Sequence, residues 1–124
     1  MESIVNISKR TNAGFDFYLL LGDFLDEFYK ESADIQLQMI SEPPEDMNKQ
    51  EYVPFLASVA HKLANDFRLE PPQWMFEKRC YLNGRNPYFA CNVKGNLRSL
   101  FMYKSPSEFK HRNLFVDENV LIRV

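Results

Sequence analysis

The sequence has few of the residues that several classes of protein require. Its four glycines leave no glycine-rich phosphate-binding loop, and the Gly-x-Ser-x-Gly and His-Glu-x-x-His motifs are missing. No apolar run approaches the roughly 18 residues of a membrane span, and no basic stretch followed by an apolar one marks secretion. The two cysteines, Cys80 and Cys91, are too few for a disulfide framework. We therefore expect a cytoplasmic protein with reduced thiols and no membrane contact.

The chain is instead rich in large hydrophobic side chains. Hydrophobic residues make up 45% of it and aromatic residues 15%, which is far from the composition of a disordered chain. A chain of 124 residues is long enough for one well-packed core but not for two. We expect a single domain over residues 1–124, in which residues 1–14 are the part that could be mobile.

The clearest helical pattern begins near Gly14. From there to Phe28 the apolar residues recur at the i, i+3, i+4 and i+7 positions, which predicts a helix of about four turns. Thr11 or Asn12 could cap its start, and Asp16 would be favourable in its first turn.

Two further helices are expected before residue 71. Ser32 could cap a short helix that must end before Pro43, although period-two alternation over residues 35–39 leaves a strand as the competing interpretation. A third helix should begin at residues 50–53 and end before Pro71.

The region from residue 71 onward alternates aromatic, proline and basic residues without a regular period. The Asn83-Gly84 pair predicts a turn that a short hairpin could use, and a helix is expected over residues 95–104. The Ser105-Pro106-Ser107-Glu108 stretch matches a capping box, so Ser105 should cap another short helix. The side chains expected to anchor this segment are Trp74, Phe89, Ser105, Phe109 and Phe115. The sequence thus predicts a mainly α domain of about five helices with an irregular, aromatic-rich C-terminal segment.

Charge divides the chain into two unequal parts. Residues 1–76 carry 6 Lys and Arg against 13 Asp and Glu, whereas residues 77–124 carry 9 against 4. Either part could form a contact surface, although the two could also simply face each other or water. The candidate partner-binding residues are Asp23 and Glu27 on the acidic side, and Arg98, Lys104, Lys110 and Arg112 on the basic side. The alternative for Arg112 is a structural role, in which its guanidinium pairs with carbonyls or with an acid in residues 1–76.

No recognised catalytic or metal-binding constellation is present. Cys80, Cys91 and His111 are spaced too widely for a zinc knuckle. A cysteine nucleophile paired with His61 or His111 would need a proximity that sequence does not establish. We therefore predict no catalytic residue, metal or cofactor, and an enzyme with an unfamiliar site stays the least favoured alternative.

Several stretches together resemble a family of small bacterial proteins, most of them uncharacterised. These stretches are Phe24–Tyr29, Met39–Pro44, Phe55–Ala64, Pro72–Trp74, Leu97-Arg98 and Ser105–Val116, and the resemblance covers about residues 17–124. In longer relatives the same region follows a helix-turn-helix, and some resemble antitoxins encoded beside nucleotidyltransferase-like toxins. This sequence has no room for a helix-turn-helix before Phe17, so the resemblance implies a partner-binding or neutralising role rather than DNA binding.

The hypothesis from sequence is therefore a non-enzymatic protein-interaction module, antitoxin-like or regulatory. Its expected partner is another protein, with the toxin-like product of a neighbouring gene as the specific case. The second hypothesis is a nucleic-acid-binding protein, because basic residues that contact phosphates interleave with aromatic residues that can stack on bases in the C-terminal half.

Overall fold

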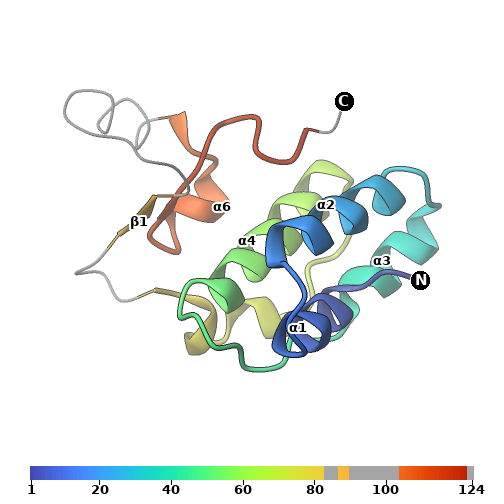
Figure 1. Cartoon of the computed structure of the whole chain (residues 1–124). Helices are drawn as coiled ribbons and strands as arrows, with labels where there is room; N and C mark the ends of the chain where they lie inside the picture. The colour runs from blue at the N-terminus through green and yellow to red at the C-terminus, as the bar shows by residue number, and fades with distance from the viewer. Residues whose placement is uncertain (83–86, 90–103, 123–124) are drawn as a thin grey trace.

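The protein is mainly helical. Its structure, a computed structural model of the whole chain, describes residues 1–82, 87–89 and 104–122 (Figure 1). The elements are helices α1 (Ile4–Asn12), α2 (Phe17–Phe28), α3 (Ala33–Ser41) and α4 (Tyr52–Asp66), 3-10 turns η1 (Gln73–Phe76) and η2 (Lys78–Cys80), strand β1 (Tyr88–Phe89), helix α6 (Ser107–Lys110) and strand β2 (Leu114–Phe115). Helix α4 contacts α1, α6 and both 3-10 turns, so it connects the N-terminal helices to the C-terminal elements. The mainly α fold class predicted from sequence is confirmed.

Helix α1 was not predicted. The Ser3 hydroxyl caps it by accepting from the Asn6 N–H at 3.2 Å, and Ile4 and Ile7 are buried in the core. Burial of these side chains ties the helix to its neighbours. Residues 4–12 therefore form a packed helix, in a part of the chain for which the sequence predicted no helix.

Helix α2 occupies the segment with the clearest helical pattern, but its cap differs from the prediction. Asp16, rather than Thr11 or Asn12, is the N-cap, and its Oδ1 accepts from the Leu19 N–H at 2.8 Å. An aspartate in this position satisfies an amide that the helix leaves unpaired. Thr11 and Asn12 belong to the last turn of α1.

Helices α3 and α4 follow the predicted boundaries closely. Helix α3 begins after Ser32 and ends at Ser41, so the alternative of a strand over residues 35–39 is wrong. Helix α4 ends where Arg68 takes a positive φ of 56°, and the Leu69 N–H then donates to the Ala64 carbonyl at 2.8 Å. This closes the C-terminus of the helix with a left-handed residue, a role in which glycine is more common.

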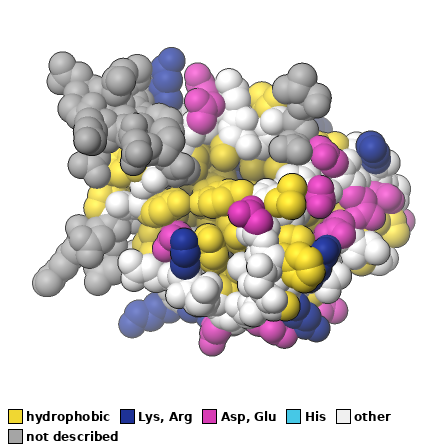
Figure 2. All heavy atoms as spheres, viewed as in Figure 1, with side chains coloured by type: hydrophobic (Ala, Val, Ile, Leu, Met, Phe, Trp, Pro, Cys, Tyr) yellow, Lys and Arg dark blue, Asp and Glu magenta, His cyan; other side chains and the backbone are white. Residues whose placement is uncertain are grey.

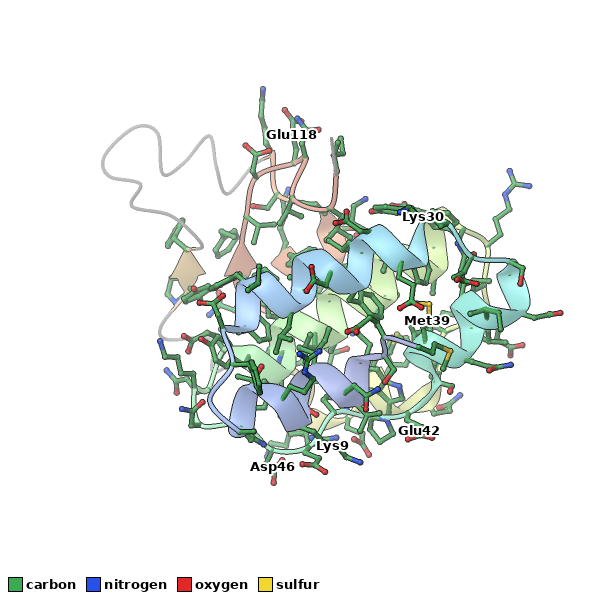
Figure 3. All side chains as sticks on the ribbon, turned by 45° about the vertical axis from the view of Figure 1, so that its right-hand side comes forward. Lys9, Lys30, Met39, Glu42, Asp46 and Glu118 are labelled. Atoms are coloured by element: carbon green, nitrogen blue, oxygen red, sulfur yellow. The ribbon has the colours of Figure 1, made fainter. Side chains whose placement is uncertain are left out.

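One hydrophobic cluster joins the helices to the C-terminal elements. Its large rings come from α2, α4, η1 and α6, and the rings of Phe55 and Phe109 meet edge to face at 5.4 Å. Each fully buried ring stabilises the fold by about 2 kcal/mol. In Figure 3, Met39 lies between the helices, whereas the labelled charged residues lie at the edge: Lys9, Lys30, Glu42, Asp46 and Glu118.

The C-terminal elements pack on α4 and pair with each other. Strands β1 and β2 are parallel, with Tyr88 opposite Leu114 and Phe89 opposite Phe115. A parallel pair cannot come from a tight hairpin. The Asn83-Gly84 turn of the predicted hairpin, and all but the last residue of the helix expected over residues 95–104, lie outside the described residues.

Ser105 is buried but does not cap α6, so this prediction is corrected. Its hydroxyl donates to the Val116 carbonyl at 2.8 Å and accepts from the Val116 N–H at 2.9 Å. Pro106 is the N-cap residue of α6, and no side chain caps the helix. Ser105 therefore joins the chain before α6 to the chain after β2.

Among the described residues, no helix combines the length and the apolar character needed to cross a bilayer.

Candidate functional site

The two predicted acidic contact residues have different environments. Asp23 is exposed on α2. Glu27 is half-buried, and its Oε2 accepts from the Glu2 N–H at 2.6 Å. Glu27 thus helps to hold the start of α1 against α2, so only Asp23 faces solvent freely enough to contact a partner.

The predicted basic residues that the structure describes have different environments. The Lys104 Nζ lies 3.8 Å from the Glu118 Oε1, with both side chains about half exposed, and Lys110 is half-buried on α6. Arg112 is only 1% exposed, and Arg98 lies outside the described residues. Of the described candidates, Lys104 and Lys110 therefore reach the surface, whereas Arg112 cannot contact a nucleic-acid backbone.

Arg112 lies at the centre of a buried polar cluster between α4, η1 and α6. Its Nη2 donates to the Met75 carbonyl at 2.8 Å, and its Nη1 donates to the Glu108 carbonyl at 2.9 Å. The same Nη1 lies 3.2 Å from the Nδ1 of His61, and the guanidinium lies 4.8 Å from the centre of the Tyr81 ring. Arginine always carries a proton at physiological pH, so the His61 Nδ1 must be the acceptor.

The charge states of this cluster follow from its geometry. Burial, and then the Arg112 guanidinium, lower the pKa of the His61 imidazole, which therefore stays neutral with its proton on Nε2. The Asn65 amide donates to the Glu108 Oε2 at 2.8 Å. Burial raises the pKa of the Glu108 carboxyl, but hydrogen bonds and nearby cations outweigh it and leave the pKa lowered.

Cys80 lies at the edge of the same cluster, and it is the free cysteine among the described residues. It is buried, its Sγ lies 3.4 Å from the Trp74 carbonyl oxygen, and burial raises the pKa of the thiol. A reactive cysteine needs the opposite shift, so Cys80 has the environment of a structural thiol.

The remaining predicted anchors line the path of the C-terminal segment. Trp74 is buried and donates from Nε1 to the Ile40 carbonyl at 3.0 Å. Phe109 is fully buried, and Phe115 is 7% exposed with its ring stacked on half-buried Phe89 at 5.2 Å. These contacts hold the segment against α3 and α4.

An exposed apolar surface lies at the start of α2. Leu19 is 66% exposed, Phe15 55% and Tyr18 44%, and the Tyr18 hydroxyl lies 2.8 Å from that of half-buried Tyr88. We call Phe15, Tyr18, Leu19 and Tyr88 the α2 patch. Figure 2 shows hydrophobic side chains gathered over the start of α2 and the C-terminal elements beside it, with acidic side chains to their right.

The α2 patch was not predicted from the sequence, although its residues could have been recognised by their positions. Phe15, Tyr18 and Leu19 are apolar residues outside the stripe that faces the core in α2. Large apolar side chains at such positions predict an interaction surface. The hydrogen bond between His61 and Arg112 could not be predicted from the sequence, because the two residues are 51 positions apart.

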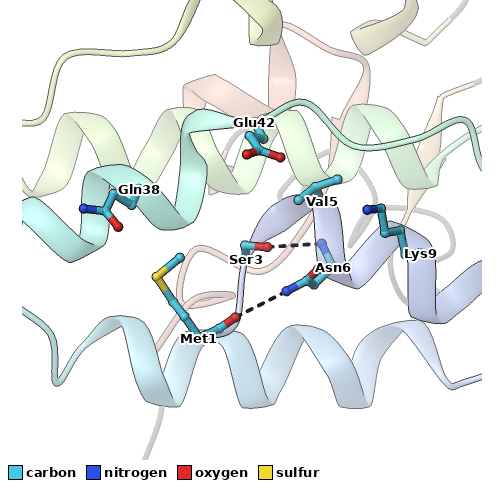
Figure 4. Close-up of a pocket in the computed structure, with 7 residues that line it drawn as sticks. All are labelled: Met1, Ser3, Val5, Asn6, Lys9, Gln38 and Glu42. Carbon is cyan, nitrogen blue, oxygen red and sulfur yellow. Dashed lines mark hydrogen bonds between the residues drawn. The ribbon is translucent and has the colours of Figure 1, made fainter.

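A polar pocket of about 230 Å³ lies between α1 and α3 (Figure 4). Its lining residues are Met1, Ser3, Val5, Asn6, Lys9, Gln38 and Glu42. The Asn6 backbone and side chain bond to Ser3 and Met1, so they are occupied within α1 and the residues that precede it. The other polar lining groups are exposed surface side chains and do not define a ligand class.

Within the described parts of the chain, no three His, Cys, Asp or Glu side chains are placed to hold a metal ion. No protein-family model, curated protein or solved structure matches this chain. The α2 patch and the Arg112 cluster are therefore the features of the molecule from which a function can be inferred.

Proposed function

We propose that the protein is a non-enzymatic protein-interaction module, antitoxin-like or regulatory in role, and that the α2 patch is its contact surface. The observation that carries this proposal is the exposure of three large apolar side chains at or just before the first turn of α2, of which Leu19 is 66% exposed. Large apolar side chains exposed in this way reduce solubility, and they are typical of protein contact sites.

The surroundings of the patch indicate the chemistry of the partner. Asp16 is exposed at the N-cap of α2, and Asp23 is exposed one turn beyond Leu19 on the same helix face. The Arg10 guanidinium lies 5.0 Å from the centre of the Phe15 ring, and its charge is partly balanced by Glu2 at 3.8 Å. We expect a partner that presents large apolar side chains flanked by lysine or arginine.

The resemblance to antitoxin-like regulators makes the product of a neighbouring, toxin-like gene the first partner to test. Nucleic acid is the less favoured alternative. The described basic residues support it weakly, because Arg112 is buried and Arg79 is paired with Glu77 and Asp46.

The test is affinity capture from nuclease-treated extract of the native host, with three forms of the tagged protein compared. The forms are the wild type, the double variant Phe15→Ser with Leu19→Ser, and the control variant Leu37→Ser. Leu37 is a good control because it is 40% exposed but lies on α3, away from the α2 patch. Circular dichroism should confirm that all three are folded.

We expect one stoichiometric protein to bind the wild type and the Leu37→Ser control, and its recovery from the double variant to fall by about tenfold or more, as for loss of hot-spot residues. Equal recovery from all three forms would reject the α2 patch as the contact surface. Recovery of nucleic acid alone, and only when nuclease is omitted, would favour the alternative function.

A further inference from the structure

The C-terminal segment is joined to the helical core by a polar contact that depends on a neutral histidine. We propose that His61 and Arg112 form a pH-sensitive latch, which holds residues 107–116 against α4 and η1 while the imidazole is neutral and releases them when it is protonated. The latch consists of the Arg112 guanidinium, the His61 Nδ1, and the carbonyl oxygens of Met75 and Glu108. It does not depend on the proposed function.

The geometry requires a neutral imidazole. The Arg112 Nη1 approaches the His61 Nδ1 to 3.2 Å, and only an unprotonated Nδ1 can accept this hydrogen bond. Protonation would place a hydrogen and a positive charge in front of a guanidinium that is 1% exposed. Two cations in contact repel, so the half-buried imidazole or the guanidinium must move, and either movement breaks the bond between His61 and Arg112.

Arg112 cannot move alone, because its other bonds join three parts of the chain. Nη2 is bonded to Met75 in η1, and Nη1 is bonded to the carbonyl of Glu108 in α6. The backbone of Arg112 is also bonded, since its carbonyl accepts from the Leu82 N–H at 3.3 Å. Displacement of the guanidinium therefore loosens the whole turn that follows α6.

The other charged groups near His61 do not cancel the repulsion between a protonated His61 and Arg112. Glu108 on α6 favours a protonated imidazole, but its Oε2 is already bonded to the Asn65 amide. His111, in the turn after α6, disfavours protonation together with Arg112. On α4 itself, Lys62 is paired with Asp66 at 3.0 Å. Burial and Arg112 remain the largest influences, so the pKa of His61 is lowered.

The sign of the pH effect follows from this shift. A released His61 has the ordinary pKa of about 6.5, whereas the latched one has a lower pKa. The latch is therefore fully present above about pH 6.5, and the ratio of released to latched forms rises by up to about tenfold per pH unit below it. The Glu108 carboxylate stays ionised in this window because its own pKa is lowered from 4.5.

Amide hydrogen exchange between about pH 7 and pH 5.5 tests the latch, with protection factors corrected for the intrinsic pH dependence. The reporter is the Val116 amide, which is bonded to Ser105 beside the latch, and the reference is the Leu20 amide, which is bonded to Asp16 in α2. In the wild type, Val116 protection should fall by up to about tenfold per pH unit while Leu20 protection stays constant.

The chain provides a matched pair of variants, because its only two histidines are His61 and His111. His61→Asn keeps an acceptor oxygen near the Nδ1 position but cannot be protonated, so Val116 protection should no longer depend on pH. His111→Asn should keep the wild-type dependence. A titration of the His61 imidazole by NMR in the wild type needs no variant, and its pKa should lie below the ordinary value of about 6.5.

Three results would each overturn the proposal. They are constant Val116 protection in the wild type, a fall that persists in His61→Asn, and a parallel fall at Leu20, which would indicate global unfolding. A His61 pKa at or above the ordinary value of about 6.5 would also reject it.

Discussion

Replacement of the buried arginine provides the sharpest test of how the C-terminal segment is held. Arg112→Ala removes two hydrogen bonds from a charged donor to backbone carbonyls, each of which contributes about 1.5–3 kcal/mol. It also leaves a cavity where a long, fully buried side chain was, at a cost of about 2 kcal/mol or more. Relief of the guanidinium desolvation offsets several kcal/mol of this loss. We expect a net loss of about 3 kcal/mol in unfolding free energy.

Urea denaturation followed by circular dichroism measures this loss, and in a thermal melt it corresponds to a fall in Tm of about 12 °C. Arg112→Met should lose about half as much, because it fills the space but leaves the carbonyls of Met75 and Glu108 without a donor. The control is Lys104→Ala, which removes a surface ion pair to Glu118 and should cost less than about 1 kcal/mol. A loss below about 1 kcal/mol for Arg112→Ala would refute the reasoning.

Three further substitutions test individual contacts by the same denaturation assay. Ser105→Ala should lower the free energy of unfolding by about 1–2 kcal/mol, because it removes both hydrogen bonds to the backbone after β2. Ser107→Ala, at an exposed position, should lower it by less than about 0.5 kcal/mol. Equal losses in the two variants would contradict this prediction. Trp74→Phe should cost about 1 kcal/mol or more, because it leaves the Ile40 carbonyl without its donor, and an unchanged stability would rule out that bond. Glu27→Gln should lower the free energy of unfolding by about 1 kcal/mol, because it weakens the hydrogen bond to the Glu2 N–H at the start of α1. Asp23→Asn should leave the stability unchanged. The opposite order would mean that the Glu27 carboxylate does not stabilise the fold.

Periodicity predicted the helices that bury a long apolar stripe, and it failed for the helix that does not. Helix α2 presents seven buried residues in twelve, so its pattern is plain in the sequence. Helix α1 buries only Ile4, Ile7 and Ser8 in nine residues, so it has no long apolar stripe. A short helix of this kind is stabilised by its tertiary contacts rather than by its own pattern, so sequence reasoning left it out.

Local motifs failed where a distant group competed for the same side chain. The residues from Ser105 to Glu108 satisfy a capping box, yet the hydroxyl of Ser105 is bonded to Val116, eleven positions away. For Arg112 the sequence left two roles open, a basic contact surface and a structural role in which the guanidinium pairs with carbonyls or an acid. Its bonds to the Met75 and Glu108 carbonyls agree with the second role. Its actual partners at His61 and Met75 are 51 and 37 positions away, and only the folded chain brings them together.

The latch and the α2 patch are connected through one residue, Tyr88. The Tyr88 N–H donates to the carbonyl of Asn113, the residue that follows Arg112, at 3.1 Å. The Tyr88 hydroxyl meets that of Tyr18 in the α2 patch at 2.8 Å. Release of the turn after α6 therefore loosens the position of Tyr88 at the contact surface.

If both proposals hold, acid should weaken partner binding in the wild type and leave it unchanged in His61→Asn, because only the wild type can protonate the acceptor of the latch. The measurement is the affinity for the partner at about pH 7 and at about pH 5.5, for the wild type and for His61→Asn. Binding that is lost in the Phe15→Ser, Leu19→Ser variant but does not depend on pH would support the α2 patch as the contact surface and reject its connection to the latch. Equal acid sensitivity in both proteins would place the titrating group in the partner or elsewhere on this chain, since the asparagine side chain of the variant cannot take up the proton.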